Sequence, residues 1–273
     1  MTHSLEAGRS WMSGTVVANG PLSDGLLRLD LELPLPTTFQ PGQFAMLNLP
    51  GAQELIFSRP FSILAARDRR VSFLYRVVGR GTRYLAAAEP GSLISFFGPL
   101  GNGFPPREGD HPVVLIAGGV GLPPLYAWFE QHGTESDLAC FGGRHGAEVP
   151  WDLLADRWRV SVDRAAQVPS GRQAYEGLVV DLCRDLLVQR SLPTATLLTC
   201  GPLPMLRAVA DLAVELGWPC FVSVEEQMGC GYGVCRGCVA PDSAGGNLTV
   251  CQDGPVFQAE QLDWSRLGHG EGV

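Results

Sequence analysis

The segment EEQMGCGYGVCRGCV, residues 225–239, followed by VCQDGPVF at 250–257, is the stretch that decides the predicted fold. Its cysteines are spaced C-x4-C-x2-C-x12-C, at Cys230, Cys235, Cys238 and Cys251. Four thiolates can hold a [2Fe–2S] cluster, and C-x4-C-x2-C is the plant-type ferredoxin spacing. Glycines at 229, 231, 233 and 237 suit such a loop, because backbone N–H groups must come close to sulfur. We therefore predict a cluster loop in a segment too small to fold on its hydrophobic core alone.

A structural zinc site is the alternative for these cysteines. Zinc is often bound by two C-x2–4-C pairs. Here three cysteines crowd into a glycine-rich loop and the fourth is isolated, which favours the iron–sulfur interpretation. The remaining cysteines lie in apolar stretches and are interpreted as small core residues: Cys140, Cys183, Cys200 and Cys220.

Upstream, residues 109–222 alternate between apolar runs and stretches with helical spacing. PVVLIAGG, at 112–119, runs into a glycine turn, as a buried parallel strand does. Further strands are expected at 137–143, 158–163, 195–201 and, as the last, 220–226. Helices are expected at 122–133, near 151–157, near 177–190 and at 203–217. This alternation predicts a doubly wound parallel sheet.

Two turns of this sheet suit a nicotinamide nucleotide. The first contains Gly118, Gly119 and Gly121. The second contains Cys200, Gly201 and Pro202. Both follow predicted strands, and ligands of open α/β sheets lie outside the carboxyl ends of the strands. Cys200 is either a neighbour of the nicotinamide or a buried thiol without a chemical role. Arg144 suits a 2′-phosphate, an adenosine or a plain surface position, so the choice between NADH and NADPH stays open.

Residues 13–104 are β-rich. Short apolar or alternating runs recur between Gly and Pro turn signals, at 14–20, 26–33, 44–49, 61–66, 71–78 and 93–101. Frequent short strands of this kind predict an antiparallel β-barrel. One helix is expected at Arg83–Ala88, with Thr82 as its N-cap and a stop near Pro90 and Gly91.

Three motifs in the barrel segment suit a flavin. The first is Arg59, Pro60, Phe61 and Ser62, which offers a guanidinium fork for a pyrophosphate and a hydroxyl for a ring nitrogen. The second is the strand end Leu74, Tyr75 and Arg76. The third is the helix start with Gly81 and Thr82, where free N–H groups favour phosphate. A core strand followed by a capped surface helix is the alternative, and the order of the three motifs favours the flavin.

Composition excludes several classes of protein. The chain has 273 residues, enough for two or three compact units. Its net charge of -8 argues against a nucleic acid or an anionic membrane as the main partner. No apolar run is long enough for a membrane-spanning helix, and the N-terminus lacks the pattern of a signal peptide, so we expect a cytoplasmic protein. In a reducing cytosol, crowded cysteines are more often ligands than disulfides.

The cysteine loop with CQDGPVF, together with the flavin and nicotinamide motifs, resembles the dihydroorotate dehydrogenase electron-transfer subunits of the ferredoxin–NADP reductase superfamily. The resemblance covers about residues 14–262. It implies an α+β multidomain chain: an FAD-binding barrel at 10–108, a nicotinamide-binding α/β domain at 109–222 and a [2Fe–2S] domain at 223–264. It also implies NAD as the nucleotide, a catalytic dihydroorotate dehydrogenase subunit as partner and a heterotetramer of two catalytic and two electron-transfer subunits.

The resemblance implies an oxidoreductase subunit of pyrimidine biosynthesis that passes electrons through the cluster and FAD to NAD. No acid, base or nucleophile is assigned, and Glu225 and Glu226 are interpreted as loop-anchoring or partner-facing charges. Tyr232 and Arg236 depart from the usual loop pattern. One alternative is a subunit of the same build that serves a sulfhydrogenase, a sulfite reductase or an electron-bifurcating transhydrogenase. The other is a zinc-stapled binding protein without redox cofactors.

Overall fold

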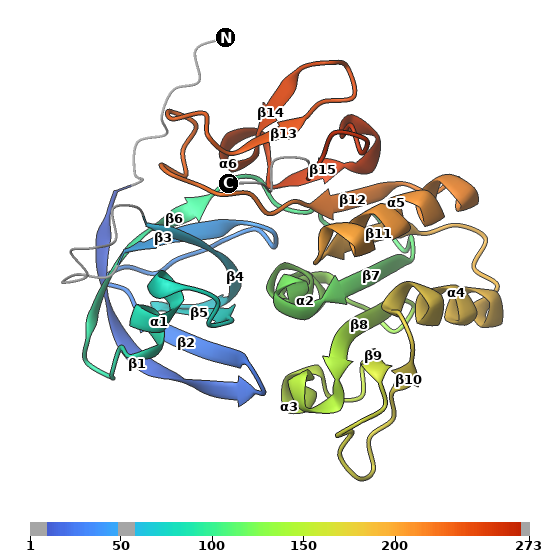
Figure 1. The fold of residues 1–273 in the computed structure, drawn as a ribbon, viewed down its shortest axis with the longest axis horizontal. Coiled ribbons are helices and arrows are strands. Elements are labelled where there is room, and N and C mark those ends of the chain that lie inside the picture. The colour runs from blue at the N-terminus through green and yellow to red at the C-terminus, as the bar shows by residue number, and fades with distance from the viewer. Residues whose placement is uncertain (1–9, 49–57, 269–273) are drawn as a thin grey trace.

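The structure, a computed structural model, describes residues 10–48 and 58–268, and the three predicted segments form three adjoining units within them (Figure 1). Leu49, the last residue of the strand predicted at 44–49, lies outside the described residues. Residues 1–9, in which we expected no signal peptide, also lie outside them. No helix among the described residues has the length and apolar character needed to cross a membrane.

The first unit is a closed antiparallel barrel with the strand order β1-β2-β5-β4-β3-β6. Its strands are β1 (Met12–Ser23), β2 (Leu26–Glu32), β3 (Phe44–Asn48), β4 (Arg59–Arg67), β5 (Arg70–Tyr75) and β6 (Leu93–Leu100). All six predicted runs are confirmed as strands. Alternate side chains point into the barrel, where Leu29, Phe73 and Phe96 are fully buried.

The barrel's helix begins earlier than predicted. The helix α1 spans Arg80–Ala86, and its N-cap is Gly79 in an extended conformation. The prediction of Thr82 as N-cap was therefore wrong, because glycine also serves as an N-cap. Thr82 instead stands at the third helical position and makes one half of a capping box: its Oγ1 accepts a hydrogen bond from the Gly79 N–H at 3.1 Å, whereas glycine has no side chain to make the other half.

The second unit is a seven-stranded sheet with the order β10-β9-β8-β7-β11-β12-β15. Its parallel strands are β7 (Val113–Gly118), β8 (Leu138–His145), β9 (Trp158–Arg164), β10 (Tyr175–Glu176), β11 (Thr196–Cys200) and β12 (Cys220–Ser223). The helices are α2 (Leu122–His132), α3 (Trp151–Leu154), α4 (Val179–Arg190) and α5 (Leu203–Leu216), with short 3-10 turns η1 (Gly119–Gly121) and η2 (Gly146–Glu148). The helix predicted near 151–157 is thus only one turn long.

Helices cover both faces of this sheet, which confirms the doubly wound arrangement. Val114 and Ile116 of β7 pack in one core with α4 and α5. Leu115 and Ala117, which alternate with them, pack in another core with α2. The side chains of a central parallel strand are therefore buried on both faces, as the continuous apolar run predicted.

The third unit contains β13 (Val239–Pro241), β14 (Asn247–Thr249), α6 (Val250–Asp253), β15 (Val256–Gln258) and η3 (Ala259–Gln261). Its strand β15 pairs antiparallel with β12, with Val222 opposite Phe257. The strand predicted at 220–226 is confirmed as β12 over Cys220–Ser223, the last parallel strand, but it does not form the edge of the sheet. The cysteine-rich segment donates the edge strand, and in doing so it places Val256 and Phe257 in the core of the α/β unit.

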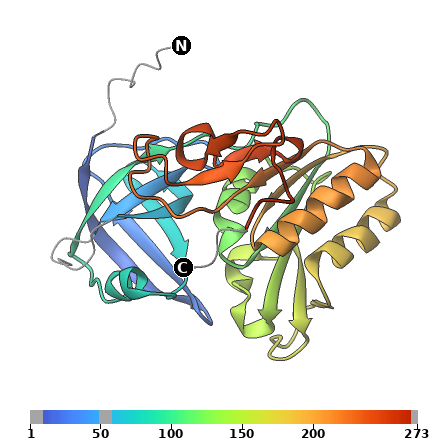
Figure 2. The same ribbon diagram turned by 45° about the horizontal axis from the view of Figure 1, so that its top comes forward.

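Asn102 joins the cysteine-rich unit to the end of the barrel. Its Nδ2 donates to the Val256 carbonyl at 2.8 Å, and its Oδ1 accepts from the Val256 N–H at 2.9 Å. Nearby, a Cβ on Gly101 would lie 2.6 Å from Pro255. These contacts attach the third unit to the end of the barrel, and Figure 2 shows that unit lying across both the barrel and the α/β unit.

Candidate functional site

The four predicted ligand cysteines come together in two pairs. In the first pair, the Cys235 N–H donates to Cys230 Sγ at 3.4 Å. In the second, the Cys251 N–H donates to Cys238 Sγ at 3.4 Å. The thiols of each pair also contact one another. The two pairs are close enough for the charge of Cys230 to raise the pKa of Cys251. Loop residues and the α6 residue Cys251 thus converge although they are far apart in the sequence.

Glycines shape the loop that carries these thiols. Gly231 and Gly233 have positive φ angles of 81° and 87°, which side chains disfavour. The Gly233 N–H donates to Cys251 Sγ at 3.1 Å, as the cluster hypothesis requires. A Cβ on Gly231 would lie 2.5 Å from Met46 of the barrel, so a side chain there would separate the loop from β3. Arg236 also has a positive φ, 52°, in spite of its side chain.

The thiols differ in their electrostatic surroundings. Burial raises the pKa of Cys230, but backbone N–H groups of Cys235, Tyr232 and Val234 outweigh it and bring the pKa to about 7. Burial and the neighbouring Cys238 raise the pKa of Cys251 to about 12. Donors aimed at sulfur stabilise a thiolate, which is the form that binds metal.

This arrangement fits a two-iron cluster. Such a cluster takes four thiolates, two for each iron, and the loop presents thiols as the pairs Cys230 with Cys235 and Cys238 with Cys251. Within the described part of the chain, no three Cys, His, Asp or Glu side chains surround a single point at metal-binding distance. Cys235 is exposed, whereas Cys238 and Cys251 are buried, so one edge of the site faces outward.

The first flavin motif divides between the two faces of β4. Phe61 points into the barrel, where its ring packs edge-on against Tyr75 with centroids 6.1 Å apart. Pro60 and Ser62 alternate with it and share the outer face with Leu64, which packs in the core of the α/β unit. Ser62 therefore faces the boundary between the two units, where a flavin ring between barrel and α/β unit would lie.

The second motif divides in the same way. Leu74 packs with Leu64 against the α/β unit. Tyr75 points inward, and its hydroxyl donates to Asn19 Oδ1 at 2.8 Å. Asn19 Nδ2 in turn donates to the carbonyl of Leu85 at 2.7 Å, at the end of α1. Burial raises the pKa of Tyr75 to about 12, partly offset by Asn19, so the phenol stays protonated.

Asn19 was missed in the sequence, although a polar side chain within the strand run VVANG was a visible signal. It links Tyr75 to α1, and so it positions the third flavin motif. At the start of α1, a Cβ on Gly81 would lie 3.1 Å from Arg59 Nε. The glycine thus lets the Arg59 side chain lie against the helix start. The first and third motifs are brought together, and the donor set fits a pyrophosphate.

The two predicted nicotinamide turns pack directly against one another. A Cβ on Gly121 would collide with the carbonyl of Cys200, and a Cβ on Gly201 would lie 3.0 Å from the Gly118 nitrogen. Gly119 is different: its φ is 54° and the space beside it is open. Two of the glycines at 118–121 therefore serve close packing between the ends of β7 and β11, and Gly119 borders open space where a phosphate would approach.

Cys200 lies in this packed region. It is 1% exposed and packs in the core that contains α2. Burial, and after it the charge of Glu225, raises the pKa of its thiol well above the usual value. The neutral, buried thiol matches the interpretation of Cys200 as a packing residue next to the turn. Pro202 starts the turn into α5.

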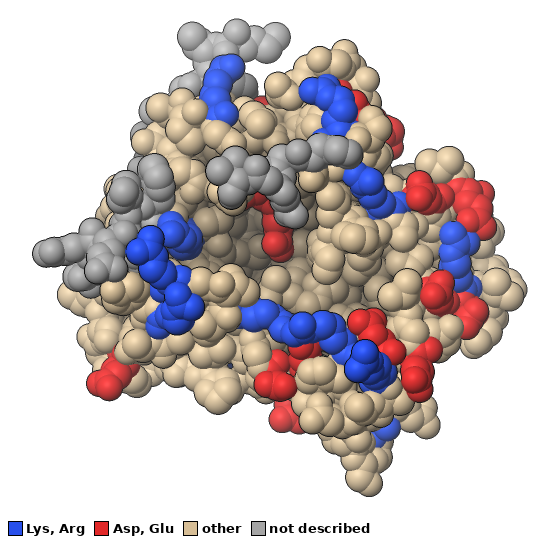
Figure 3. Space-filling view, viewed as in Figure 1, with Lys and Arg blue, Asp and Glu red and all other residues tan. Residues whose placement is uncertain are grey.

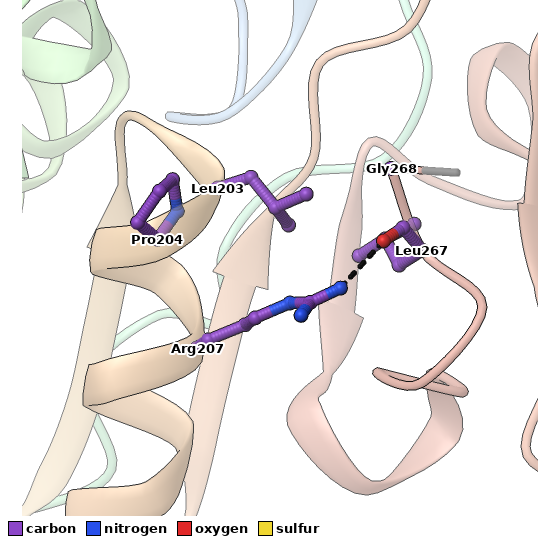
Figure 4. Close-up of a pocket in the computed structure, with 5 residues that line it drawn as sticks. All are labelled: Leu203, Pro204, Arg207, Leu267 and Gly268. Atoms are coloured by element: carbon purple, nitrogen blue, oxygen red, sulfur yellow. Dashed lines mark hydrogen bonds between the residues drawn. The ribbon is translucent and has the colours of Figure 1, made fainter. Parts of the chain in front are cut away.

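A cavity of about 340 Å³ lies beside α5, lined by Leu203, Pro204, Arg207, Leu267 and Gly268 (Figure 4). Arg207 Nη2 crosses it and donates to the Leu267 carbonyl at 2.6 Å. The bond anchors the chain after η3 to α5, away from all three flavin motifs. We therefore interpret this cavity as part of the packing of the third unit.

The three candidate sites adjoin. Helix α2, which follows the first nicotinamide turn, packs along β4, which carries the first flavin motif. Met46 of β3, which touches the cysteine loop at Gly231, is paired with Pro60 of β4. Phe97 of β6 contacts Tyr232 of the loop, with ring centroids 5.8 Å apart. The order across the molecule is therefore nicotinamide turns, flavin motifs and cysteine loop.

The sequence of this chain is similar to a family model and to proteins of known name. Residues 225–263 match the family model described as the iron-sulfur cluster binding domain of dihydroorotate dehydrogenase B. The chain is 34% identical over 232 residues to "Dihydroorotate dehydrogenase B (NAD(+)), electron transfer subunit" of Geobacillus kaustophilus (strain HTA426), covering 82% of this chain and 86% of that one. It is 35% identical over 260 residues to the protein of the same name from Bacillus velezensis, covering 91% and 97%.

Solved structures show the same architecture. One is described under "Insights into flavin-based electron bifurcation via the NADH-dependent reduced ferredoxin-NADP oxidoreductase structure"; its TM-score is 0.78 at 25% identity, covering 93% of this chain and 91% of that one. Another is a ferredoxin NADP+ reductase from Neisseria gonorrhoeae with bound FAD and NADP, with a TM-score of 0.63 at 18% identity, covering 76% and 92%. The second likeness concerns the fold alone.

Proposed function

Because the chain belongs to the family of dihydroorotate dehydrogenase B electron-transfer subunits, we propose that it carries electrons between a catalytic dihydroorotate dehydrogenase subunit and NAD. It does so through a [2Fe–2S] cluster and FAD. The cluster is held by the four loop cysteines within 223–264, the flavin by the barrel at 10–108, and the nicotinamide nucleotide by the α/β domain at 109–222.

The observation that carries this proposal is the contact between the cysteine loop and the flavin motif. Gly231 lies against Met46, and Met46 pairs with Pro60 on the next strand. Paired residues of neighbouring strands have Cα atoms about 5 Å apart. The cluster loop and the flavin motif are thus separated by a single strand spacing, with the buried Met46 between them.

Each group would supply a distinct part of the chemistry when bound: the nicotinamide exchanges a hydride, FAD converts between two-electron and one-electron transfer, and the cluster passes single electrons. The chain's own residues bind and orient. Ser62 and Arg76 face the boundary between the units, and Arg59 with the start of α1 holds the pyrophosphate. Phe61 and Tyr75 support this wall from inside the barrel. No residue is assigned as a catalytic acid, base or nucleophile.

The nucleotide binds across the turns at 118–121 and 200–202, at the carboxyl ends of β7 and β11. Gly119 borders the open approach, and the surrounding glycines allow the two turns to meet. Helix α2, which begins at the first turn, packs along β4, the strand that carries Ser62. The names of the relatives specify NAD(+), and we propose NAD rather than NADP as the acceptor.

The catalytic subunit docks where the cysteine loop is exposed. Trp11 stacks on Phe97 with centroids 5.2 Å apart, and Phe97 meets Tyr232. Trp11 and Tyr232 are 49% and 45% exposed, and Val234 next to Cys235 is 73% exposed. Exposed aromatic and apolar side chains of this kind are enriched at protein interfaces. We call Trp11, Phe97, Tyr232 and Val234 the aromatic face.

We propose a complex of two catalytic and two electron-transfer subunits in the cytoplasm. None of the eight cysteines forms a disulfide in the structure, which suits a reducing compartment. A second candidate function keeps the same electron path but another partner, such as a sulfhydrogenase, a sulfite reductase or a bifurcating transhydrogenase. This chain is similar over 93% of its length to the structure described for electron bifurcation. That similarity is the observation that favours this second candidate function.

An anaerobic visible spectrum of the purified chain, with iron, sulfide, zinc and flavin analysis, tests the proposal. We expect two irons, two sulfides and one FAD per chain, and both chromophores should bleach when NADH is added. A colourless protein that contains zinc would contradict the electron-transfer function and favour the zinc-stapled binding protein. A second experiment separates the two candidate functions. If the first is right, the chain co-purifies with a dihydroorotate dehydrogenase, and the mixture reduces NAD when dihydroorotate is added.

A further inference from the structure

Glu148 binds arginines from two different units of the protein. It ends η2, directly after β8, and its side chain is only 5% exposed. Its Oε1 accepts a hydrogen bond from Arg76 Nη1 of the barrel at 3.1 Å. The same oxygen accepts from Arg144 Nε at 2.9 Å and from Arg144 Nη2, and Oε2 accepts from the Arg144 backbone N–H at 3.3 Å. One carboxylate thus holds an arginine of the flavin motif and an arginine considered for the nucleotide.

The turn between β1 and β2 closes over the same place. Ser23 Oγ donates to the Glu148 carbonyl at 2.8 Å, and the Asp24 N–H donates to the Ala147 carbonyl at 2.8 Å. We call Ser23, Asp24, Arg76, Arg144 and Glu148 the rim clamp. Figure 3 shows basic and acidic side chains meeting along the lower boundary between the barrel and the α/β unit, where the turn between β1 and β2 approaches α3 in Figure 1.

The two arginines of the rim clamp lie on strands that also carry residues of the predicted flavin and nicotinamide motifs, or that pair with such strands. Arg76 follows Leu74 by two residues, and Leu74 is buried against the α/β unit. Arg144 lies on β8, which pairs with β7 so that Gly142 is opposite Gly118 of the nicotinamide turn. A shift at the rim clamp is therefore transmitted through one strand to the flavin side and through another to the nicotinamide side.

The charges explain why the carboxylate is needed. Burial raises the pKa of Glu148, but hydrogen bonds from Arg144 and Arg76 outweigh it and lower the pKa to about 2. The group is therefore ionised at neutral pH. His145 Nε2 also lies 3.7 Å from Glu148 Oε1 and 3.9 Å from Asp24 Oδ2. Without the carboxylate, the guanidinium groups of Arg76, whose side chain is 23% exposed, and Arg144, whose side chain is 68% exposed, would face each other with no anion between them.

We propose that Glu148 is a positioning residue that closes the barrel against the α/β domain and so sets the distance between the bound nicotinamide and the flavin. The proposal rests on the proposed function for its redox readout. In this role the carboxylate acts through Arg76 and Arg144, to which it is hydrogen-bonded. It is distinct from the apolar contact of Leu64 and Leu74, which holds the two units together elsewhere along their boundary.

The test uses Glu148→Gln, which keeps the shape and removes the charge, in the full chain with its cofactors. The first readout is amide hydrogen exchange of Asp24, whose N–H is bonded across the boundary. The second is the single-turnover rate of flavin reduction by NADH. We expect Asp24 exchange to rise about 10-fold or more and the reduction rate to fall about 10-fold or more, with flavin and iron content unchanged, because small misplacements cost large factors in rate.

Two further variants sharpen the result. Ser23→Ala removes a neutral contact of the rim clamp, and we expect it to change both readouts less than about 3-fold. Glu148→Gln combined with Arg144→Gln removes the repulsion between the arginines, and we expect Asp24 protection to recover, measured without nucleotide. Recovery in this double variant identifies charge balance, rather than lost packing, as the cause.

Three outcomes overturn the proposal: unchanged Asp24 exchange in Glu148→Gln, raised exchange with an unchanged reduction rate, or loss of FAD from the variant, which would make Glu148 a flavin-binding residue. Failure of the proposed function has a different signature. In that case NADH would not bleach the unaltered protein, whereas the exchange measurements would still show whether the rim clamp closes the boundary.

Discussion

Met46 on β3 lies against Gly231 of the cysteine loop, 2.5 Å from the position that a Cβ on that glycine would occupy. Because Met46 also pairs with Pro60, this contact sets the spacing between the loop and the flavin motif. The glycine is required twice, for its φ of 81° and for the absence of a side chain. A residue larger than glycine would therefore prevent this close approach of the loop to β3.

Replacing Gly231 with Ala should destabilise the loop by about 1–3 kcal/mol, the range for forcing extra volume into a packed site. We expect reduced iron content and slower electron transfer from flavin to cluster. Gly245→Ala is the matched control, because Gly245 also has a positive φ, 92°, but nothing lies near its Cβ position. Equal losses in the two variants would mean that backbone strain, and not contact with Met46, is responsible.

Replacing Cys251 with Ser should remove the iron–sulfur absorbance and the bound iron and leave the FAD in place. Cys251 is one of two thiols in the buried pair, and a serine hydroxyl is a poor substitute for a soft thiolate ligand. Cys183→Ala should leave the iron content unchanged, since Cys183 is a buried thiol of α4 that packs beside Cys140 of β8. Full iron occupancy in Cys251→Ser would refute the ligand assignment.

The nicotinamide turns offer a test that separates packing from ligand binding. Gly121→Ala should lower the midpoint of thermal unfolding by several degrees, because its Cβ would collide with the carbonyl of Cys200. Gly119→Ala, beside open space, should cost only about 1 kcal/mol of backbone strain and raise the Kd for NADH. Titrations of NADH against flavin bleaching provide the Kd. The assignment fails if Gly119→Ala unfolds the domain and Gly121→Ala does not.

The aromatic face should carry much of the affinity for the catalytic subunit. We expect Tyr232→Ala or Trp11→Ala to weaken the complex by about 1–2 kcal/mol, within the range for interface aromatic residues, without loss of FAD or iron. Isothermal titration with the catalytic subunit measures this change. Leu35→Ala, at a residue that is 62% exposed on the barrel, serves as the control. An unchanged affinity in both aromatic variants would place the partner elsewhere.

The stability contributed by Glu148 should depend on pH with a defined sign. Its pKa falls from the ordinary 4.5 to about 2 in the folded protein, so the contribution is complete above pH 4.5. As the pH falls below 4.5, the unfolded chain takes up the proton first, and the contribution declines until it is lost near pH 2. The difference in unfolding free energy between the unaltered protein and Glu148→Gln, measured as a function of pH, gives the contribution of the Glu148 carboxylate. A difference that grew on acidification would contradict the sign.

Local sequence patterns predicted most of the secondary structure. The six barrel runs and the apolar run at 112–119 carry the period of their elements in their own residues, so no distant contact was needed to identify them. The N-terminus of α1 was missed because glycine and threonine both cap helices, and neighbouring residues do not say which one does. The edge strand β15 was missed because three residues in a loop-rich segment become a strand only by pairing with β12.

By itself, the sequence determined the kind of chemistry: the four thiols, their spacing, and the glycine turns and arginines suited to phosphates are all local properties of short segments. Only the tertiary structure decided which residues meet. The contact of Gly231 with Met46, the link from Tyr75 through Asn19 to α1, and the bond from Arg76 to Glu148 each join residues far apart in the chain. Such contacts arise from the packing of whole elements, and no local pattern of residues encodes them.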